Sequence, residues 1–92
     1  MVFSGTTSGN ATSEFFLTPV NITSFSLVNN SGSSLTITAG VLYGSTIVLF
    51  YSGVIGANSS FNYTGEQITV LKDYRLLVTT SGAGCNYYFT IL

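Results

Sequence analysis

The sequence contains very few charged side chains. Its 92 residues include two basic and three acidic ones, namely Lys72, Arg75, Glu14, Glu66 and Asp73. Charged residues are therefore 5% of the chain, whereas an ordinary soluble domain has roughly 25%. Two cations cannot neutralise a useful run of phosphates or hold a chain on an anionic membrane surface. We therefore expect neither a nucleic acid nor a membrane as a partner.

The residues on which most enzymes and metal sites depend are also scarce. The chain has no histidine and a single cysteine, so it lacks a Ser–His or Cys–His nucleophile pair and the usual ligands of zinc. A calcium site needs several carboxylates in one loop, and the three acidic residues do not provide them. Glu14 and Glu66 form a pair of the glycosidase type only if the fold brings them together. We expect a protein that is not an enzyme and that holds no cofactor or metal.

Cys85 is the only cysteine, which excludes a disulfide within the chain. The sequence favours a small hydrophobic role for this residue, partly buried beside the last strand. The alternative is an intermolecular disulfide or a reactive thiol, although no histidine or lysine lies beside it to lower its pKa.

Targeting and membrane signals are weak. The first residues lack the cationic segment and the apolar segment of a secretory signal peptide. Residues 35–57 are uncharged and long enough to span a bilayer. They are also rich in β-branched and turn-forming residues and have no basic flank. We therefore favour strands over a transmembrane helix in this segment.

The chain contains a regular series of short alternating segments. Serine and threonine total 26 residues, and apolar and polar side chains alternate with a period of two between turn-forming residues. The pattern predicts strands at residues 14–18, 22–29, 34–43, 46–51, 59–63, 67–71, 74–80 and 86–92. Lys72 and Asp73 are predicted to form a two-residue hairpin turn. Such a series indicates an antiparallel sandwich or a small barrel. We predict an all-β fold, an antiparallel β-sandwich (jelly-roll-like or immunoglobulin-like) of seven or eight short strands.

The first thirteen residues differ from the rest. Residues 1–13 are rich in serine, threonine and glycine and have little to bury. We predict that they form a flexible polar N-terminal arm, which either frays or becomes ordered against a neighbouring subunit. Residues 14–92 would then form a single β-sandwich domain.

Residues 46–51 are apolar at nearly every position and include no charge or proline. Such a strand must be covered on both faces, and it favours aggregation when it is exposed. Because the chain has so few charges to guard its edges, we expect a homo-oligomer or attachment to a larger particle. The predicted interface residues are Ile47, Leu49 and Tyr51 or Val48 and Phe50, whichever set faces outward, together with Arg75. Alternatively, Arg75 belongs to a hairpin end that is exposed to solvent and makes no interface.

The six tyrosines suggest a second function. Aromatic rings on a β-sandwich can stack on sugar rings, so a glycan- or host-surface-binding module is the alternative to a structural subunit. Tyr87 and Tyr88 are the residues on which such binding would depend. The absence of tryptophan counts against this alternative.

The whole chain after residue 13 resembles small virion proteins of bacterial viruses. The shared features are a Ser/Thr/Gly-rich arm, a strand like residues 22–30, a Gly-Glu turn before residues 67–70, and closing strands such as 74–80 and 87–92. Capsid decoration (cement) proteins and small spike or fibre subunits have similar sequence features. The resemblance implies a structural subunit, often trimeric, that binds the major capsid or other virion proteins. It also implies synthesis in the host cytoplasm before assembly into the virion. The near absence of charge departs from the acidic character of many decoration proteins and leaves open a more buried capsid or fibre role.

Overall fold

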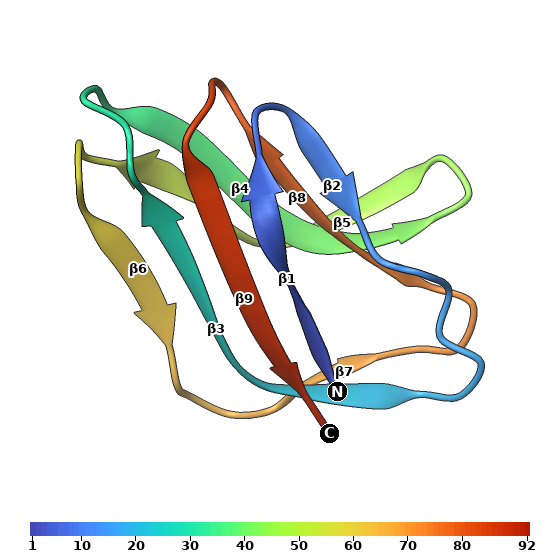
Figure 1. The fold of residues 1–92 in the computed structure, drawn as a ribbon. Helices are drawn as coiled ribbons and strands as arrows, with labels where there is room; N and C mark the ends of the chain where they lie inside the picture. Colours follow the sequence, from blue (N-terminus) through green and yellow to red (C-terminus); the bar gives the residue numbers. More distant parts are fainter.

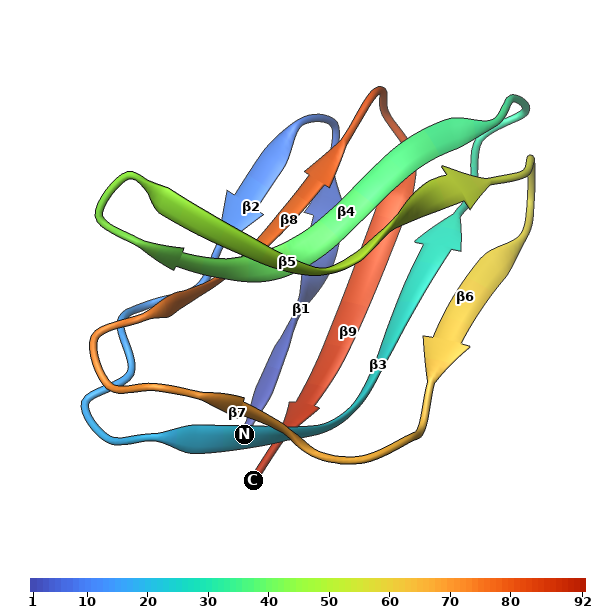
Figure 2. The same ribbon diagram turned by 180° about the vertical axis from the view of Figure 1, so that it is seen from behind.

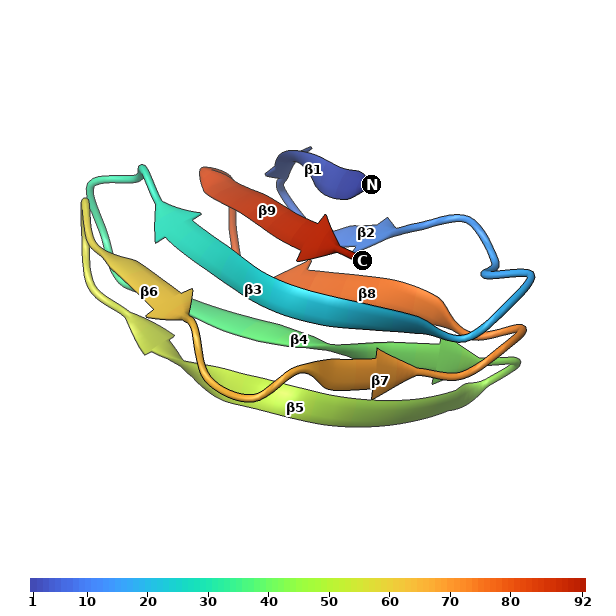
Figure 3. The same cartoon turned by 90° about the horizontal axis from the view of Figure 1, so that it is seen from below.

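The computed structural model describes all 92 residues and contains nine β-strands and no helix (Figure 1). The strands are β1 (Val2–Thr7), β2 (Asn10–Thr12), β3 (Val20–Asn29), β4 (Leu35–Tyr43), β5 (Thr46–Ile55), β6 (Ser60–Tyr63), β7 (Ile68–Val70), β8 (Arg75–Thr80) and β9 (Cys85–Ile91). They form two sheets that lie one above the other, as Figure 3 shows. The predicted all-β sandwich is confirmed.

Every strand pair in the two sheets is antiparallel. The first sheet has the order β1-β9-β3-β6, and β7 pairs with the start of β3 beyond the end of β6. The second sheet has the order β2-β8-β4-β5 (Figure 2). Most neighbours in the sheets are distant in the sequence, so the fold depends on non-local pairing.

The core lies between the sheets and is built from alternate residues of the central strands. Phe25 and Leu27 of β3 and Phe89 of β9 point inward and are buried, and so are Ile37 of β4 and Val78 of β8. The Phe25 ring lies 5.1 Å from the Phe89 ring between centroids. Such stacked aromatic pairs contribute roughly 0.5–1.5 kcal/mol beyond the area that they bury. Along β3 and β9 the buried residues follow the period of two that predicted the strands, whereas Leu76, Leu77 and Val78 of β8 are all buried.

Residues 1–13 lie within the domain, and the structure differs here from the predicted arm followed by a domain at 14–92. β1 pairs with β9 along its whole length, and β2 pairs with β8. Because β1 belongs to one sheet and β2 to the other, the segment closes one side of the sandwich (Figure 1). These edge strands need little apolar content. Phe3 of β1 packs on the core, with its ring 4.8 Å from that of Tyr87.

Residues 14–18, predicted as a strand, form a loop that carries the chain from β2 in one sheet to β3 in the other. The Phe16 N–H donates to the Tyr74 carbonyl oxygen at 3.1 Å, and the Phe16 carbonyl oxygen accepts from the Asp73 N–H at 2.8 Å. Phe16 is thereby held in the core, while Phe15 and Leu17 on either side of it are exposed. Buried and exposed side chains alternate in this segment as in a strand, but its backbone forms hydrogen bonds to a turn and not to a sheet.

Lys72 and Asp73 form a turn as predicted, but not the turn of a hairpin. The Tyr74 N–H closes the turn on the Leu71 carbonyl oxygen at 3.2 Å. Asp73 has a φ of 70°, a left-handed conformation that aspartate tolerates better than most residues. β7 belongs to the first sheet and β8 to the second, so the turn is a corner between the two layers.

Candidate interaction surface

Exposed apolar side chains gather at the end of the hairpin formed by β4 and β5. The strands are joined by Gly44 and Ser45, and Gly44 has the positive φ of 60° that a tight hairpin turn requires. The tip of this hairpin projects sideways from the sandwich, in light green at the right of Figure 1 and at the left of Figure 2. Ile47, Val48 and Leu49 are exposed there by 53%, 56% and 47%. β5 is an edge strand, so one row of its backbone groups faces no neighbouring strand.

A β-bulge in β5 separates this exposed end from the rest of the strand. Ala39 pairs with Tyr51 and the next residue, Gly40, pairs with Leu49, so Phe50 has no partner in β4. The extra residue changes which side chains of β5 point inward on either side of it. A strict alternation along residues 46–51, which the sequence suggested, therefore does not hold.

The structure divides the predicted β5 interface residues into two groups. The Phe50 ring lies 5.4 Å from the Phe25 ring, and the Tyr51 ring lies 4.3 Å from the Phe61 ring, so both pack against the core. The three residues before the bulge, 47–49, are the exposed ones. Neither predicted alternating set describes this arrangement. The strand is not covered on both faces either, because its side chains are exposed on both faces where the hairpin projects.

Arg75 adjoins this hairpin end. It lies in register with Leu42 of β4, which in turn lies opposite Ile47 of β5. The Arg75 guanidinium carbon lies 3.9 Å from the centroid of the Phe15 ring, which is a cation–π contact. Arg75 thus connects the exposed hairpin to the loop before β3. We call the surface formed by Phe15, Ile47, Val48, Leu49 and Arg75 the apolar end.

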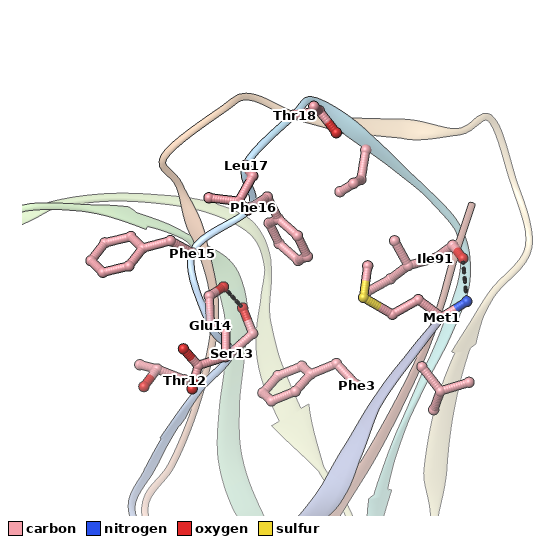
Figure 4. A pocket seen from close by; sticks show the side chains of 12 residues that line it. Met1, Phe3, Thr12, Ser13, Glu14, Phe15, Phe16, Leu17, Thr18 and Ile91 are labelled. Carbon is pink, nitrogen blue, oxygen red and sulfur yellow. Dashed lines mark hydrogen bonds between the residues drawn. The ribbon is translucent and has the colours of Figure 1, made fainter.

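A cavity of about 530 Å³ opens between the start of β1, the end of β9 and the loop before β3 (Figure 4). Its walls are mostly apolar and include Met1, Phe3, Phe16 and Ile91, and the Met1 nitrogen donates to the Ile91 carbonyl oxygen at 3.0 Å. Glu14 is the one charged residue in its lining. Sequence reasoning missed this cavity because its walls come from both ends of the chain. The run of apolar residues at 15–17 was the only local signal.

The residues considered for metal or nucleophilic chemistry lie in different parts of the structure. No group of three or more His, Cys, Asp or Glu side chains is placed to hold a metal ion. Cys85 is a free, buried cysteine of the core cluster, and burial raises the pKa of its thiol above the ordinary 9.0. A raised pKa keeps the thiol protonated and poorly nucleophilic, which agrees with the small hydrophobic role. Glu14 lines the cavity and Glu66 lies in the loop between β6 and β7. No helix is long and apolar enough to cross a membrane.

The tyrosines differ sharply in their surroundings. Tyr43 stacks on Tyr74 with 5.0 Å between ring centroids, and Tyr87 packs inward on Phe3. Tyr88 points to the opposite side of β9 from Tyr87 and is 52% exposed. Of the two tyrosines predicted for sugar binding, the structure therefore leaves Tyr88 open to a ligand.

Comparison with known proteins supports the fold. No protein family and no curated protein matches the sequence. Among solved structures, the crystal structure of a protein named PirA is similar over 98% of this chain and 90% of its own, with a TM-score of 0.56 and 13% identity. A structure of infectious bursal disease virus, Gx strain, matches 98% of this chain and 28% of its own chain, with a TM-score of 0.34 and 16% identity. The chain is thus a small antiparallel β-sandwich, and it shares this fold with PirA.

Proposed function

We propose that this protein is a non-enzymatic structural subunit that associates with copies of itself through the apolar end. The observation that carries the proposal is the exposure of Ile47, Val48 and Leu49 side by side on an edge strand. β5 contains no charged residue and no proline, although these are the usual means by which an edge strand avoids pairing. A chain that covered this end would bury apolar surface worth about 25 cal/mol per Å². It would also supply partners for the unpaired backbone of β5.

The bulge at Phe50 restricts where such pairing occurs. A bulge disrupts the regular ladder and twists the strand locally, so the segment before it is the best template for an added strand. Arg75 lies across β4 from that segment, in register with Leu42 and Ile47, and arginine is enriched among the residues that dominate binding at protein interfaces. Apolar anchors and an open strand edge therefore occur together on β5, and an arginine lies two strands away in the same sheet.

In its more specific form, the proposal is that the assembly is a virion. The protein would decorate or cement a capsid, or form part of a spike or fibre of a bacterial virus. Its partners would be its own copies, in a trimer or another ring, and the major capsid or other virion proteins. It would be made in the host cytoplasm and end in the virion. The resemblance of the chain to small virion proteins supports this form, and so does a charge content of 5%, which suits a subunit whose surface is largely covered by neighbours.

Light scattering coupled to size-exclusion chromatography tests the association. We expect the wild type to elute at a multiple of 9.7 kDa and the double variant Ile47→Lys/Leu49→Lys to elute as a folded monomer. The control is Ser8→Lys/Asn10→Lys, which adds the same charge at two exposed positions around the β1–β2 turn. It should keep the wild-type mass. A wild type that is monomeric at micromolar concentration, or a control that dissociates as readily, would overturn the proposal.

Density-gradient fractionation of a viral lysate tests the more specific form. The protein should sediment with intact particles in a fixed ratio to the major capsid protein. Recovery in the soluble fractions alone would contradict the virion role and would leave the self-association untouched.

A further inference from the structure

The outer face of the first sheet is a second surface, with a different composition from the apolar end. β1, β9 and β3 lie side by side in this sheet (Figure 1). Tyr88 lies in the middle strand, opposite Ser4 of β1 on one side and Ser26 of β3 on the other. The neighbouring rungs of the sheet are Thr6–Asn86–Val28 and Val2–Thr90–Ser24. We call this grid, which has mostly hydroxyl and amide side chains and two valines around one aromatic ring, the Tyr88 face.

The Tyr88 face is hollowed beside the ring. A shallow depression of about 300 Å³ is walled by Ser4, Thr6, Ser26, Asn86 and Tyr88, among others. Sites for small ligands typically combine such a concavity and an apolar or aromatic wall with a few convergent polar groups. The tyrosine ring supplies the aromatic wall, and the side chains of β1, β3 and β9 supply the polar groups.

The polar side chains of the depression are ordered but not fully used. The hydroxyl of Thr6 donates to the Asn86 side-chain oxygen at 2.7 Å, which is the one hydrogen bond between side chains of this grid. That bond fixes the Asn86 amide and leaves its NH₂ group free to donate to a ligand. Ser4 and Ser26 lie opposite Tyr88 on the two neighbouring strands and line the same depression, and each hydroxyl is both a donor and an acceptor.

The charge distribution selects the class of ligand. The chain has five charged side chains, and none of them lies on β1, β3 or β9. A face without charged side chains gives little advantage to a phosphate, a sulfate or an acidic peptide. Protein interfaces rely on several clustered aromatic and arginine anchors, whereas this face has one ring among hydroxyl and amide groups. A neutral sugar chain, with apolar ring faces and many hydroxyls, is complementary to it.

We propose that the Tyr88 face binds a neutral glycan, with one sugar ring stacked on Tyr88 and its hydroxyls bonded to Ser4, Ser26 and Asn86. This function goes beyond self-association, because the face lies on the sheet that does not contain the apolar end. The two surfaces are therefore available in the same molecule.

Isothermal titration calorimetry with neutral hexasaccharides of the cellulose, amylose, chitin and galactan types tests the proposal, with a sulfated heparin fragment as comparison. We expect the wild type to bind at least one neutral sugar more tightly than the heparin fragment. Tyr88→Ala should raise the Kd at least about tenfold, and Tyr88→Phe should change it by less than about threefold because the stacking ring is kept. Ser26→Val, which removes one flanking hydroxyl, should weaken binding several-fold and serves as the test if Tyr88→Ala does not fold.

Tyr43→Ala is the matched control, because Tyr43 is also 52% exposed but lies on β4 of the other sheet. It should leave sugar binding unchanged, as should the association-deficient variant Ile47→Lys/Leu49→Lys. The proposal is overturned if no neutral sugar binds the wild type, if the heparin fragment binds more tightly, or if Tyr43→Ala and Tyr88→Ala weaken binding equally.

Discussion

Gly40 sets the shape of the β4–β5 hairpin at a single position. At the bulge, the backbone of β5 passes so close to β4 that a Cβ on Gly40 would collide with the Val48 carbonyl oxygen and lie 2.8 Å from the Leu49 Cα. The obstacle is backbone, which cannot swing aside as the end of a long side chain can. Glycine at this position therefore allows the close approach that places Val48 and Leu49 on the apolar end.

We expect Gly40→Ala to lower the free energy of unfolding by about 2 kcal/mol or more, as overpacking against a fixed backbone does. Urea denaturation followed by circular dichroism measures the change. Gly32→Ala, in the loop between β3 and β4, is the matched control. A Cβ there meets nothing within 4 Å, so the expected change is within about 0.5 kcal/mol. Equal stability of the two variants would contradict the close approach at the bulge.

Asn29 acts over a longer distance than its place in the sequence indicates. It is the one buried polar residue, and its amide NH₂ donates to the carbonyl oxygens of Ser33, Ile55 and Gly56 at 2.8, 2.9 and 3.1 Å. Its side-chain oxygen accepts from the Ser31 N–H and hydroxyl. One side chain thus joins the loop after β3 to the end of β5. In the sequence it was only the last residue of the strand predicted at 22–29.

The prediction of a flexible N-terminal arm differs from the structure at β1 and β2. Deleting residues 1–9 would remove all of β1, leave β9 as an exposed edge and uncover the core beside Phe3. We expect the free energy of unfolding to fall by about 3 kcal/mol or more, because the deletion removes both the partly buried Phe3 ring and the whole β1–β9 pairing, and full burial of a phenylalanine alone contributes roughly 1.5–3 kcal/mol. Urea denaturation of the shortened chain measures this. Phe3→Ser in the full chain separates the contribution of the ring from that of strand pairing. If the deletion variant unfolds at the same urea concentration as the wild type, residues 1–9 contribute nothing to stability, as predicted for a flexible arm.

The elements that the sequence predicted well are those with one buried and one exposed face. β3 and β9 each place apolar residues inward and hydroxyl or amide residues outward, so their period of two could be recognised without the structure. β1 and β2 escaped recognition because these edge strands have little apolar content: β1 has one aromatic residue, Phe3, and β2 has none. At Lys72–Asp73 the local turn chemistry is the same for a hairpin and for a corner. The choice between them depends on sheet membership, which is non-local.

The same limits apply to the candidate interaction surface. The apolar character of residues 46–51 was visible in the sequence and gave the correct start of the strand, although β5 continues to Ile55. The bulge that turns Phe50 inward was not visible, because it depends on how β5 registers with β4. Likewise, the sequence named Tyr87 and Tyr88 together. Their positions on opposite faces of β9 follow from alternation. Which of the two faces is exposed to solvent depends on which one the second sheet covers.

At the scale of the whole molecule, the two proposed surfaces have different partners. The apolar end lies on the second sheet and on the loop before β3, and the Tyr88 face lies outside the first sheet. The five charged side chains lie in loops and turns or, for Arg75, at the start of β8. The Tyr88 face therefore has no charged side chain, and the apolar end has only Arg75. Subunits that meet through their apolar ends would leave the Tyr88 face free for sugar.

An interface of this kind should respond to temperature and salt as the hydrophobic effect does. Burial of apolar surface is driven by entropy near room temperature and weakens on cooling, so the Kd of self-association should fall on warming from about 5 to 25 °C. Sodium sulfate should tighten the association, since it is excluded from protein surfaces. Sodium chloride should change the Kd by less than about twofold between low and physiological ionic strength. Sedimentation equilibrium measures all three. Marked weakening by sodium chloride would instead assign the contact to ion pairs, and in a chain with two basic side chains the first candidate would be Arg75.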